Sequence, residues 1–188
     1  MRLRIRHIIL LAGLFLLTAC GTRYVPRPYG YFRISFPEHA YQVQTLGECP
    51  VQAEVSTSAQ VEARGEAYWL DLVYPSLNAR LHCSYKPVQG NLRELGDDAQ
   101  EFVFKHAGIA SSIPEQGYED DERRVYGVLY ELRGNTASPY QFYLTDSTNH
   151  FFRGALYFDC VPNQDSLAPV ISYLEEDIRH IIETLSWQ

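Results

Sequence analysis

The sequence predicts an α+β domain, in which an antiparallel β-sheet carries packed helices. The first observation is that residues 125–158 hold three segments rich in aromatic and β-branched residues, separated by short runs of turn formers. This pattern is typical of an antiparallel meander. The second is that residues 91–103 and 166–185 repeat apolar residues at three- and four-residue spacing, which indicates helices. Strands, a helix, three strands and a helix in this order favour an α+β domain.

Four strands are expected before the first helix. Tyr31 to Phe36 alternates with period two and ends before a proline, and Val51 to Val55 is the second candidate. Ala67 to Tyr74 and Ala79 to Tyr85 flank the sequence PSLN. These two segments therefore predict a hairpin with a proline-led turn.

The first helix is expected to begin after Asn91, a residue type that caps helices. Its apolar residues fall on one helical face: Leu92, Leu95, Ala99, Phe102 and Val103. The acidic run that follows, Gly117 to Arg124, shows no regular spacing of oxygen ligands for calcium. We therefore expect this run to be a solvated loop.

The meander is predicted to consist of strands at 125–132, 140–145 and 150–158. The sequences GNTASP and DSTN connect them, and both are rich in turn formers. The last of these strands, HFFRGALYF, carries large side chains on both faces, so we expect it to be covered on both sides. A partner-binding surface is the alternative, because Tyr and Arg are enriched at protein interfaces.

The second helix is expected over Ser166 to Leu185, where the apolar residues form a continuous stripe. Pro169 falls in its first turn, where no backbone donor is missed. Asp165 and Ser166 are both candidate caps. The acidic residues 175–177 are expected on its outer face.

The first twenty residues predict export and lipid attachment. The basic sequence MRLRIRH precedes a short apolar run, which describes a secretory signal rather than a spanning helix of about 20 apolar residues. The ending LTAC looks like a bacterial lipobox, in which Cys20 is acylated and becomes the first mature residue. Because Gly21 rather than Asp follows, we expect anchoring on the periplasmic face of the outer membrane. The expected organisation is a signal peptide (1–19), a lipidated N-terminus and linker (20–29) and a single periplasmic domain (30–188).

Charge and cysteines narrow the class of partner and the compartment. The predicted signal holds three of the 16 basic residues and none of the 23 acidic ones, so its removal takes the net charge from −7 to −10. Such a surface disfavours nucleic acid as a partner, because phosphate contacts dominate that kind of binding. With Cys20 acylated, Cys49, Cys83 and Cys160 remain, which predicts one disulfide and one free thiol in an oxidising periplasm. The residues alone leave the pairing open.

No constellation in the sequence predicts catalysis, a metal or a cofactor. Asp146, Ser147 and His150 lie in one short turn, whereas the partners of a catalytic triad usually converge from separate elements. Asp and Ser in such a turn ordinarily accept hydrogen bonds from the backbone. Nucleotide-binding glycine loops are absent from the sequence, as is HExxH. The histidines of the expected domain are scattered along it: His39, His82, His106, His150 and His180.

Several long segments resemble the gliding-motility lipoprotein D family (GldD) of the Bacteroidetes. The most distinctive are RGNTASPYQFYLTDST (133–148), HFFRGALYF (150–158) and PNQDSLAPV (162–170), and the similarity runs from about residue 24 to 187. The resemblance implies a lipoprotein needed for gliding motility and for the linked type IX secretion machinery. It implies no enzymatic activity and no cofactor, and its partners would be other protein components of that apparatus. Cys20 is the one site residue that it carries over.

The resemblance also bears on the cysteines and the fold. In the family a cysteine often precedes the tryptophan found here at position 69, but this chain has Tyr68 there, while Cys83 lies on the facing strand of the predicted hairpin. A Cys49–Cys83 disulfide is implied in this way. The last helix after an antiparallel meander is similar to the Mog1/PsbP-like α/β/α sandwich, which is an analogy at the level of the fold.

Three functions are compared below. The first is a non-catalytic, membrane-tethered assembly component, with Asp146, His150 and Arg153 as candidate interaction residues, provided that they are accessible. The second is a periplasmic binding module for glycan or peptide, which would use exposed Tyr and Trp as platforms. The third, a hydrolase that uses Ser147 and His150, is disfavoured by the missing nucleophile elbow.

Overall fold

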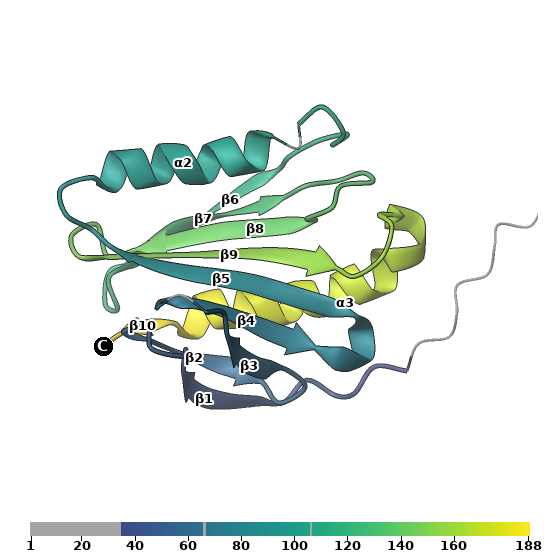
Figure 1. Cartoon of the computed structure of the whole chain (residues 1–188), viewed down its shortest axis with the longest axis horizontal. Coiled ribbons are helices and arrows are strands. Elements are labelled where there is room, and N and C mark those ends of the chain that lie inside the picture. The colour runs from purple at the N-terminus through teal and green to yellow at the C-terminus, as the bar shows by residue number, and fades with distance from the viewer. Residues whose placement is uncertain (1–34, 66, 106) are drawn as a thin grey trace, which may run out of the picture. The chain divides into compact units, whose positions relative to one another are not determined.

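A seven-stranded antiparallel sheet dominates the part of the chain that the computed structural model describes, residues 35–65, 67–105 and 107–188 (Figure 1). Its strand order is β3-β4-β5-β9-β8-β7-β6. The strands are β3 (Gln60–Ala63), β4 (Trp69–Tyr74), β5 (Ala79–Pro87), β6 (Glu115–Asp120), β7 (Val125–Glu131), β8 (Tyr140–Thr145) and β9 (His150–Phe158). The predicted hairpin is β4–β5, closed by the 3₁₀ turn Pro75–Leu77, and the predicted meander is β7–β8–β9.

A second, three-stranded sheet has the order β1-β2-β10. It is formed by β1 (Tyr41–Thr45), β2 (Val51–Ser56) and the short β10 (Ser186–Trp187) at the end of the chain. The two helices of the described residues are α2 (Leu92–Phe104) and α3 (Gln164–Thr184). Antiparallel sheets with packed helices confirm the predicted α+β class.

Alternating side chains place the two helices on opposite faces of the large sheet. On β9, Phe152 belongs to the main core with α3 and β2, whereas its neighbour Phe151 packs under α2 with Leu95 and Ala99. Successive residues of a strand point to opposite faces, so both faces of β9 are covered here, as predicted. Both rings are buried, and each such burial contributes about 2 kcal/mol to stability.

The acidic loop is a wrong prediction in its first half, and the predicted N-terminal strand is not formed at the two of its residues that the structure describes. Of the strand expected at 31–36, residues 31–34 lie outside the described residues, and Ser35 and Phe36 are in no strand. The first half of the run expected to be a solvated loop, residues 117–120, belongs to β6, which pairs with β7, and its second half, residues 121–124, is the turn between these two strands. β6 is an edge strand, where charged side chains reach water while the backbone still pairs. The charged composition of this run suggested a loop, but backbone pairing with β7 does not require apolar side chains.

The cap of α3 differs from the prediction, whereas Asn91 stands at the predicted N-cap position of α2 without a capping side-chain hydrogen bond. The cap of α3 is Asn163, whose side-chain oxygen accepts a hydrogen bond from the Ser166 amide at 3.1 Å, so neither predicted cap is used. Asn91 does precede α2, but its Oδ1 accepts from the Gln89 amide before the helix. Asp177, expected on the outer face of α3, is fully buried.

Cys49 and Cys83 are both free thiols buried in the main core, so the predicted disulfide is not formed in the structure. Burial raises the pKa of the Cys49 thiol to about 11 and that of Cys83 higher still. Cys160 is free and exposed. Whether Cys49 and Cys83 join in an oxidising compartment stays a prediction. Cys20 lies outside the described residues.

Among the described residues, neither helix has the length and apolar character needed to cross a membrane.

Candidate functional site

The turn between β8 and β9 is built around the carboxylate of Asp146. Its Oδ1 accepts hydrogen bonds from the amides of Thr148, Asn149 and His150 at 2.7–2.9 Å, and its Oδ2 accepts from the Thr148 hydroxyl at 2.7 Å. Burial alone would raise the pKa of Asp146, but these hydrogen bonds outweigh it and hold the pKa well below its usual range. Asp146 therefore closes the turn, and a part for it in binding a partner stays a prediction.

His150 faces away from the serine that the hydrolase hypothesis would need. Its Nδ1 lies 2.9 Å from the hydroxyl of Tyr85, and its ring stacks on Trp187 at a centroid distance of 5.0 Å. Ser147 is exposed in a left-handed turn conformation, with φ 68°. Asp146, whose carboxylate would have to orient the histidine in a triad, accepts hydrogen bonds from backbone amides instead. This geometry gives the predicted Asp146, Ser147 and His150 set no catalytic arrangement.

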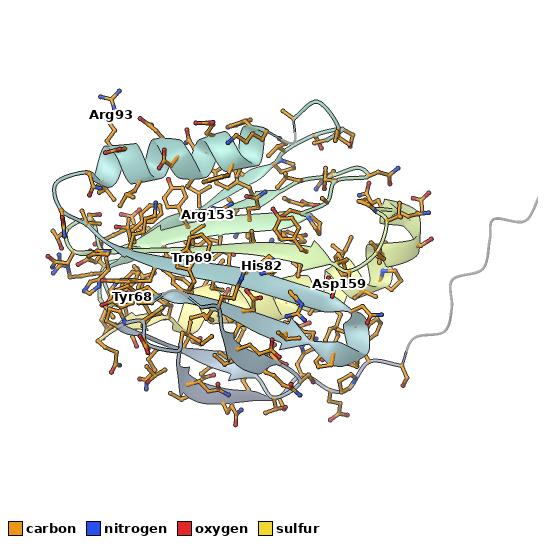
Figure 2. The ribbon with its side chains drawn as sticks, in the orientation of Figure 1. Tyr68, Trp69, His82, Arg93, Arg153 and Asp159 are labelled. Carbon is orange, nitrogen blue, oxygen red and sulfur yellow. The ribbon has the colours of Figure 1, made fainter. Side chains whose placement is uncertain are left out.

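Arg153, the third candidate residue, lies in a different environment. It projects from β9 into a groove between α2 and the uncovered part of the large sheet, with a volume of about 480 Å³ (Figure 2). We call this hollow the α2 groove. Its lining is mostly apolar and comes from α2, β4, β5 and β9. The residues used below are Trp69, His82, Ser84, Phe102, Arg153 and Tyr157.

The guanidinium of Arg153 is held in place by an amide and a ring. Its Nη2 donates to Oε1 of Gln141 at 2.7 Å, and its Cζ lies 4.7 Å from the ring centroid of Phe102. The side chain is half-buried, and this burial lowers the pKa of Arg153 from its usual value. No carboxylate among the described residues forms an ion pair with it. An arginine stays charged at any physiological pH, so the groove contains a partly desolvated positive charge.

Aromatic side chains form the exposed walls of the α2 groove. Trp69 is 42% exposed at the start of β4, and Phe102 is 47% exposed on the side of α2 that faces the sheet. Tyr68, just before β4, has a φ of 70°, which residues other than glycine rarely adopt. The sequence places Phe102 on the apolar face of the first helix and gives Trp69 no particular role. One signal in the sequence could have pointed to Trp69. The two-residue period of a strand puts Trp69 on the same face as the charged Asp71.

An ion-pair cluster lies beside the groove on β4 and β5. The Nδ1 of His82 lies 2.7 Å from Oδ1 of the buried Asp71, which also has Arg64 and Arg80 at 3.7 Å. Ser84 follows His82 on the same face of β5, so an acid, an imidazole and a hydroxyl occur in one region of the sheet. In a catalytic triad the histidine also bonds the serine hydroxyl. The described residues show no such bond, so the cluster supports no hydrolytic mechanism.

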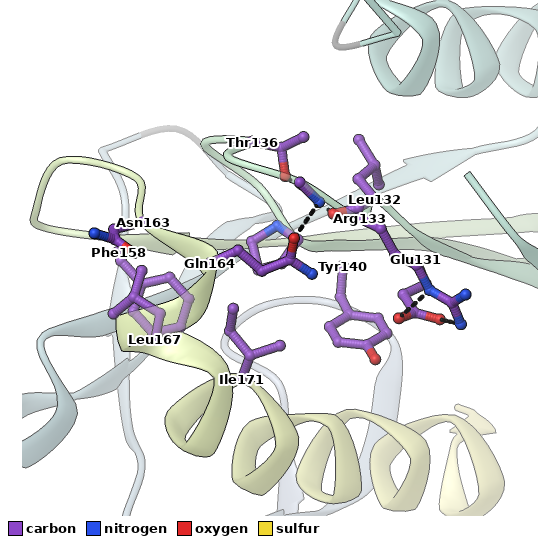
Figure 3. A pocket seen from close by; sticks show the side chains of 12 residues that line it. Glu131, Leu132, Arg133, Thr136, Tyr140, Phe158, Asn163, Gln164, Leu167 and Ile171 are labelled. Atoms are coloured by element: carbon purple, nitrogen blue, oxygen red, sulfur yellow. Dashed lines mark hydrogen bonds and ion pairs between the residues drawn. The ribbon is translucent and has the colours of Figure 1, made fainter. Parts of the chain in front are cut away.

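Three other hollows among the described residues carry less. The first measures about 190 Å³ next to Cys49 and Trp69, and Glu48 is its one charged lining residue. The second, at the start of α3, measures about 30 Å³, room for little more than a water molecule (Figure 3). Gln164 crosses it and accepts a hydrogen bond from the Gly134 amide at 2.7 Å. The third is an open surface over α3, where Glu175 is engaged by Arg179 and His180 by Glu54. The α2 groove is therefore the candidate functional site.

Comparison with known proteins adds one result. The family model described as gliding motility lipoprotein GldD matches residues 21–187, nearly all of the chain. A search of curated proteins found no match.

Proposed function

The chain belongs to the family of gliding motility lipoprotein GldD, and from this premise we propose that it is a non-catalytic assembly component of the gliding and type IX secretion machinery. Membership associates the chain with gliding motility and with a membrane-anchored place in the cell envelope. The link to secretion, the structural role and the position on the periplasmic face of the outer membrane are parts of the proposal.

The anchor in this proposal is a lipid on Cys20, after removal of residues 1–19. One acyl chain gives only marginal membrane binding, whereas two or more give stable attachment. Residues 20–29 would then link the lipid to a periplasmic domain that comprises residues 30–188. The basic start, the short apolar run and the ending LTAC support this organisation.

The α2 groove is the observation that carries an assembly role. Trp, Tyr and Arg are the residue types that contribute most to binding energy in protein interfaces, and the groove combines exposed Trp69 with Arg153 and Tyr157. A structural part that only filled space would not need an exposed indole beside a partly desolvated guanidinium. We infer that the protein acts by holding another component of the machine in this groove.

Deletion of the gene tests the proposal directly. We expect loss of gliding and loss of type IX cargo from the culture medium, both restored by the unchanged gene. A Cys20→Ala variant should fail to restore either function and should move to the soluble periplasmic fraction. Normal gliding and normal cargo export in the deletion strain would overturn the proposal.

A binding module for glycan or peptide is the second candidate. An aromatic-lined groove of about 480 Å³ favours it, because small-ligand sites are mostly apolar hollows with a few convergent polar groups. The two candidates separate in affinity purification from native envelopes. An assembly component should bring down other proteins of the machine, whereas a glycan-binding module should be released by free saccharide.

A further inference from the structure

We propose that the α2 groove binds an acidic peptide segment of a partner protein, in which a carboxylate pairs with Arg153 and a neighbouring apolar side chain packs against Trp69 and Phe102. The inference rests on the proposed assembly role and names the chemistry of the partner. Its premises are the unpaired charge of Arg153, the sign of the charges around the groove and its apolar lining.

The first premise is the guanidinium of Arg153. It has five N–H donors, and the described residues provide one hydrogen-bond acceptor, Oε1 of Gln141. Removing a cation from water is costly unless an anion and further hydrogen bonds compensate. A planar guanidinium matches a carboxylate with two parallel hydrogen bonds. A carboxylate from outside the chain would therefore satisfy the donors that the fold leaves unused.

The second premise is charge complementarity. The chain is acidic overall, with a net charge of −7, yet the groove is lined by Arg64, Lys86 and Arg153 against a single acid, Asp98. Of these cations, Arg64 already pairs with the nearby Asp71 at 3.7 Å, as does Arg80, whereas Lys86 and Arg153 form no ion pair among the described residues. The groove is thus a positive site on a negative protein, which favours an acidic ligand and steers it there.

The third premise selects a peptide among acidic ligands. Leu95, Ala99, Phe102, Phe151, Ala155 and Tyr157 make the lining predominantly apolar. An acidic sugar has no apolar side chain to bury against such a lining, and a nucleic acid would be repelled by the rest of the surface. A peptide presents a carboxylate and an aliphatic or aromatic side chain a few ångströms apart. The two separate cations Lys86 and Arg153 also suit a segment with more than one acid better than a single chain terminus.

The test uses residues 20–188 with Cys20 replaced by Ser and a blocked synthetic peptide, acetyl-Leu-Glu-Phe-Glu-Leu-amide, as the probe. Calorimetry gives the affinity, and NMR of labelled protein locates binding through the Trp69 indole and the α2 amides. The Arg153→Gln variant should bind the probe about tenfold or more weakly, which is about 1.4 kcal/mol. Replacing both Glu of the probe by Gln should produce a similar loss. With the Gln probe, Arg153→Gln should cause little further loss, because the carboxylate that pairs with Arg153 is already absent.

Two variants keep the result interpretable. Arg93→Gln removes the same charge from the outer side of α2, where the side chain is 95% exposed, and should leave affinity within about twofold (Figure 2). Phe102→Ala truncates an exposed wall of the groove and should weaken binding about tenfold while the protein stays folded. Equal loss in the Arg93 and Arg153 variants would show unspecific charge attraction and would overturn the proposal.

Other outcomes also decide against it. Binding of trigalacturonate in place of the peptide, with the same dependence on Arg153, would assign the groove to an acidic glycan. In cells, Arg153→Gln should reduce gliding and cargo export. If Arg153→Gln restores a deletion strain fully while the empty vector does not, the acidic-peptide site is wrong although the assembly role stands. If the deletion strain itself is normal, the proposed function fails.

Discussion

The Nδ1 of His39 lies 2.8 Å from Oδ1 of Asp177, a carboxylate on α3 that is completely shielded from solvent. The hydroxyl of Tyr41 donates to the same oxygen at 3.1 Å. Burial and the adjacent Asp177 raise the pKa of the Tyr41 hydroxyl, so it remains a donor at any physiological pH. The segment at the beginning of the described residues is thereby tied to the last helix.

Replacing Asp177 by Ala should destabilise the protein by about 3 kcal/mol, because it leaves the partly buried side chains of His39 and Tyr41 without their shared acceptor. Urea unfolding measures this change. Glu176→Ala is the matched control, since that carboxylate is 66% exposed and contacts Nε2 of the same imidazole at 3.2 Å. Glu176→Ala should lower the free energy of unfolding by less than about 1 kcal/mol. Equal costs would refute the interpretation of Asp177.

The Asp146 turn should make stability depend on pH in the acidic range. The pKa of Asp146 is lower in the folded state than in the unfolded chain, where it is about 3.9. The contribution of the ionised Asp146 carboxylate to the free energy of unfolding is therefore complete at neutral pH and is lost as the pH falls below about 5. Asp146→Asn should flatten the stability curve between pH 5 and pH 2 and should lower stability at pH 7 by about 2 kcal/mol. Asp98→Asn, at an exposed position, should leave the slope of stability against pH as it is in the unchanged protein. A similar slope in the Asp146→Asn and Asp98→Asn variants would contradict the prediction.

Two glycines should respond to alanine with opposite signs. Gly154 on β9 lies against the ring of Phe142, its partner on β8, and a Cβ there would overlap that ring. Gly154→Ala should destabilise the protein by about 1–3 kcal/mol through overpacking. Gly96 in α2 has open space around it, so Gly96→Ala should stabilise by about 0.5–1 kcal/mol. Thermal unfolding measures both, and a neutral Gly154→Ala would show that the ring can move aside.

The three thiols should differ in reactivity. Cys160 is exposed, whereas Cys49 and Cys83 are buried and have raised pKa values. Because the thiolate is the reactive form, iodoacetamide should modify Cys160 alone in the folded protein. Mass spectrometry after unfolding without reductant then decides the pairing. Two further adducts would show free thiols as in the structure, and none would show the Cys49–Cys83 disulfide.

The candidate site was only partly predictable. The sequence points to Arg153, because Tyr and Arg are enriched at protein interfaces and both occur on this strand. Asp146 was read as a turn former, and the structure shows that function in its hydrogen bonds to backbone amides. Trp69 and Phe102 were not connected with Arg153, since they are separated from it by 84 and 51 positions along the chain. Periodicity shows which way a side chain points but not which distant side chain it meets.

The sequence by itself determined the family, the hairpin, the meander and both helices, because each of these is expressed in residues close together along the chain. Tertiary structure alone decided that the first half of the acidic run pairs as part of β6, that Asp177 turns inward to His39 and that α2 leaves part of the sheet uncovered. These features depend on contacts between segments far apart, where backbone pairing and the burial of whole faces outweigh local composition. The α2 groove is of this second kind, since it exists only because α2, β4, β5 and β9 are brought together.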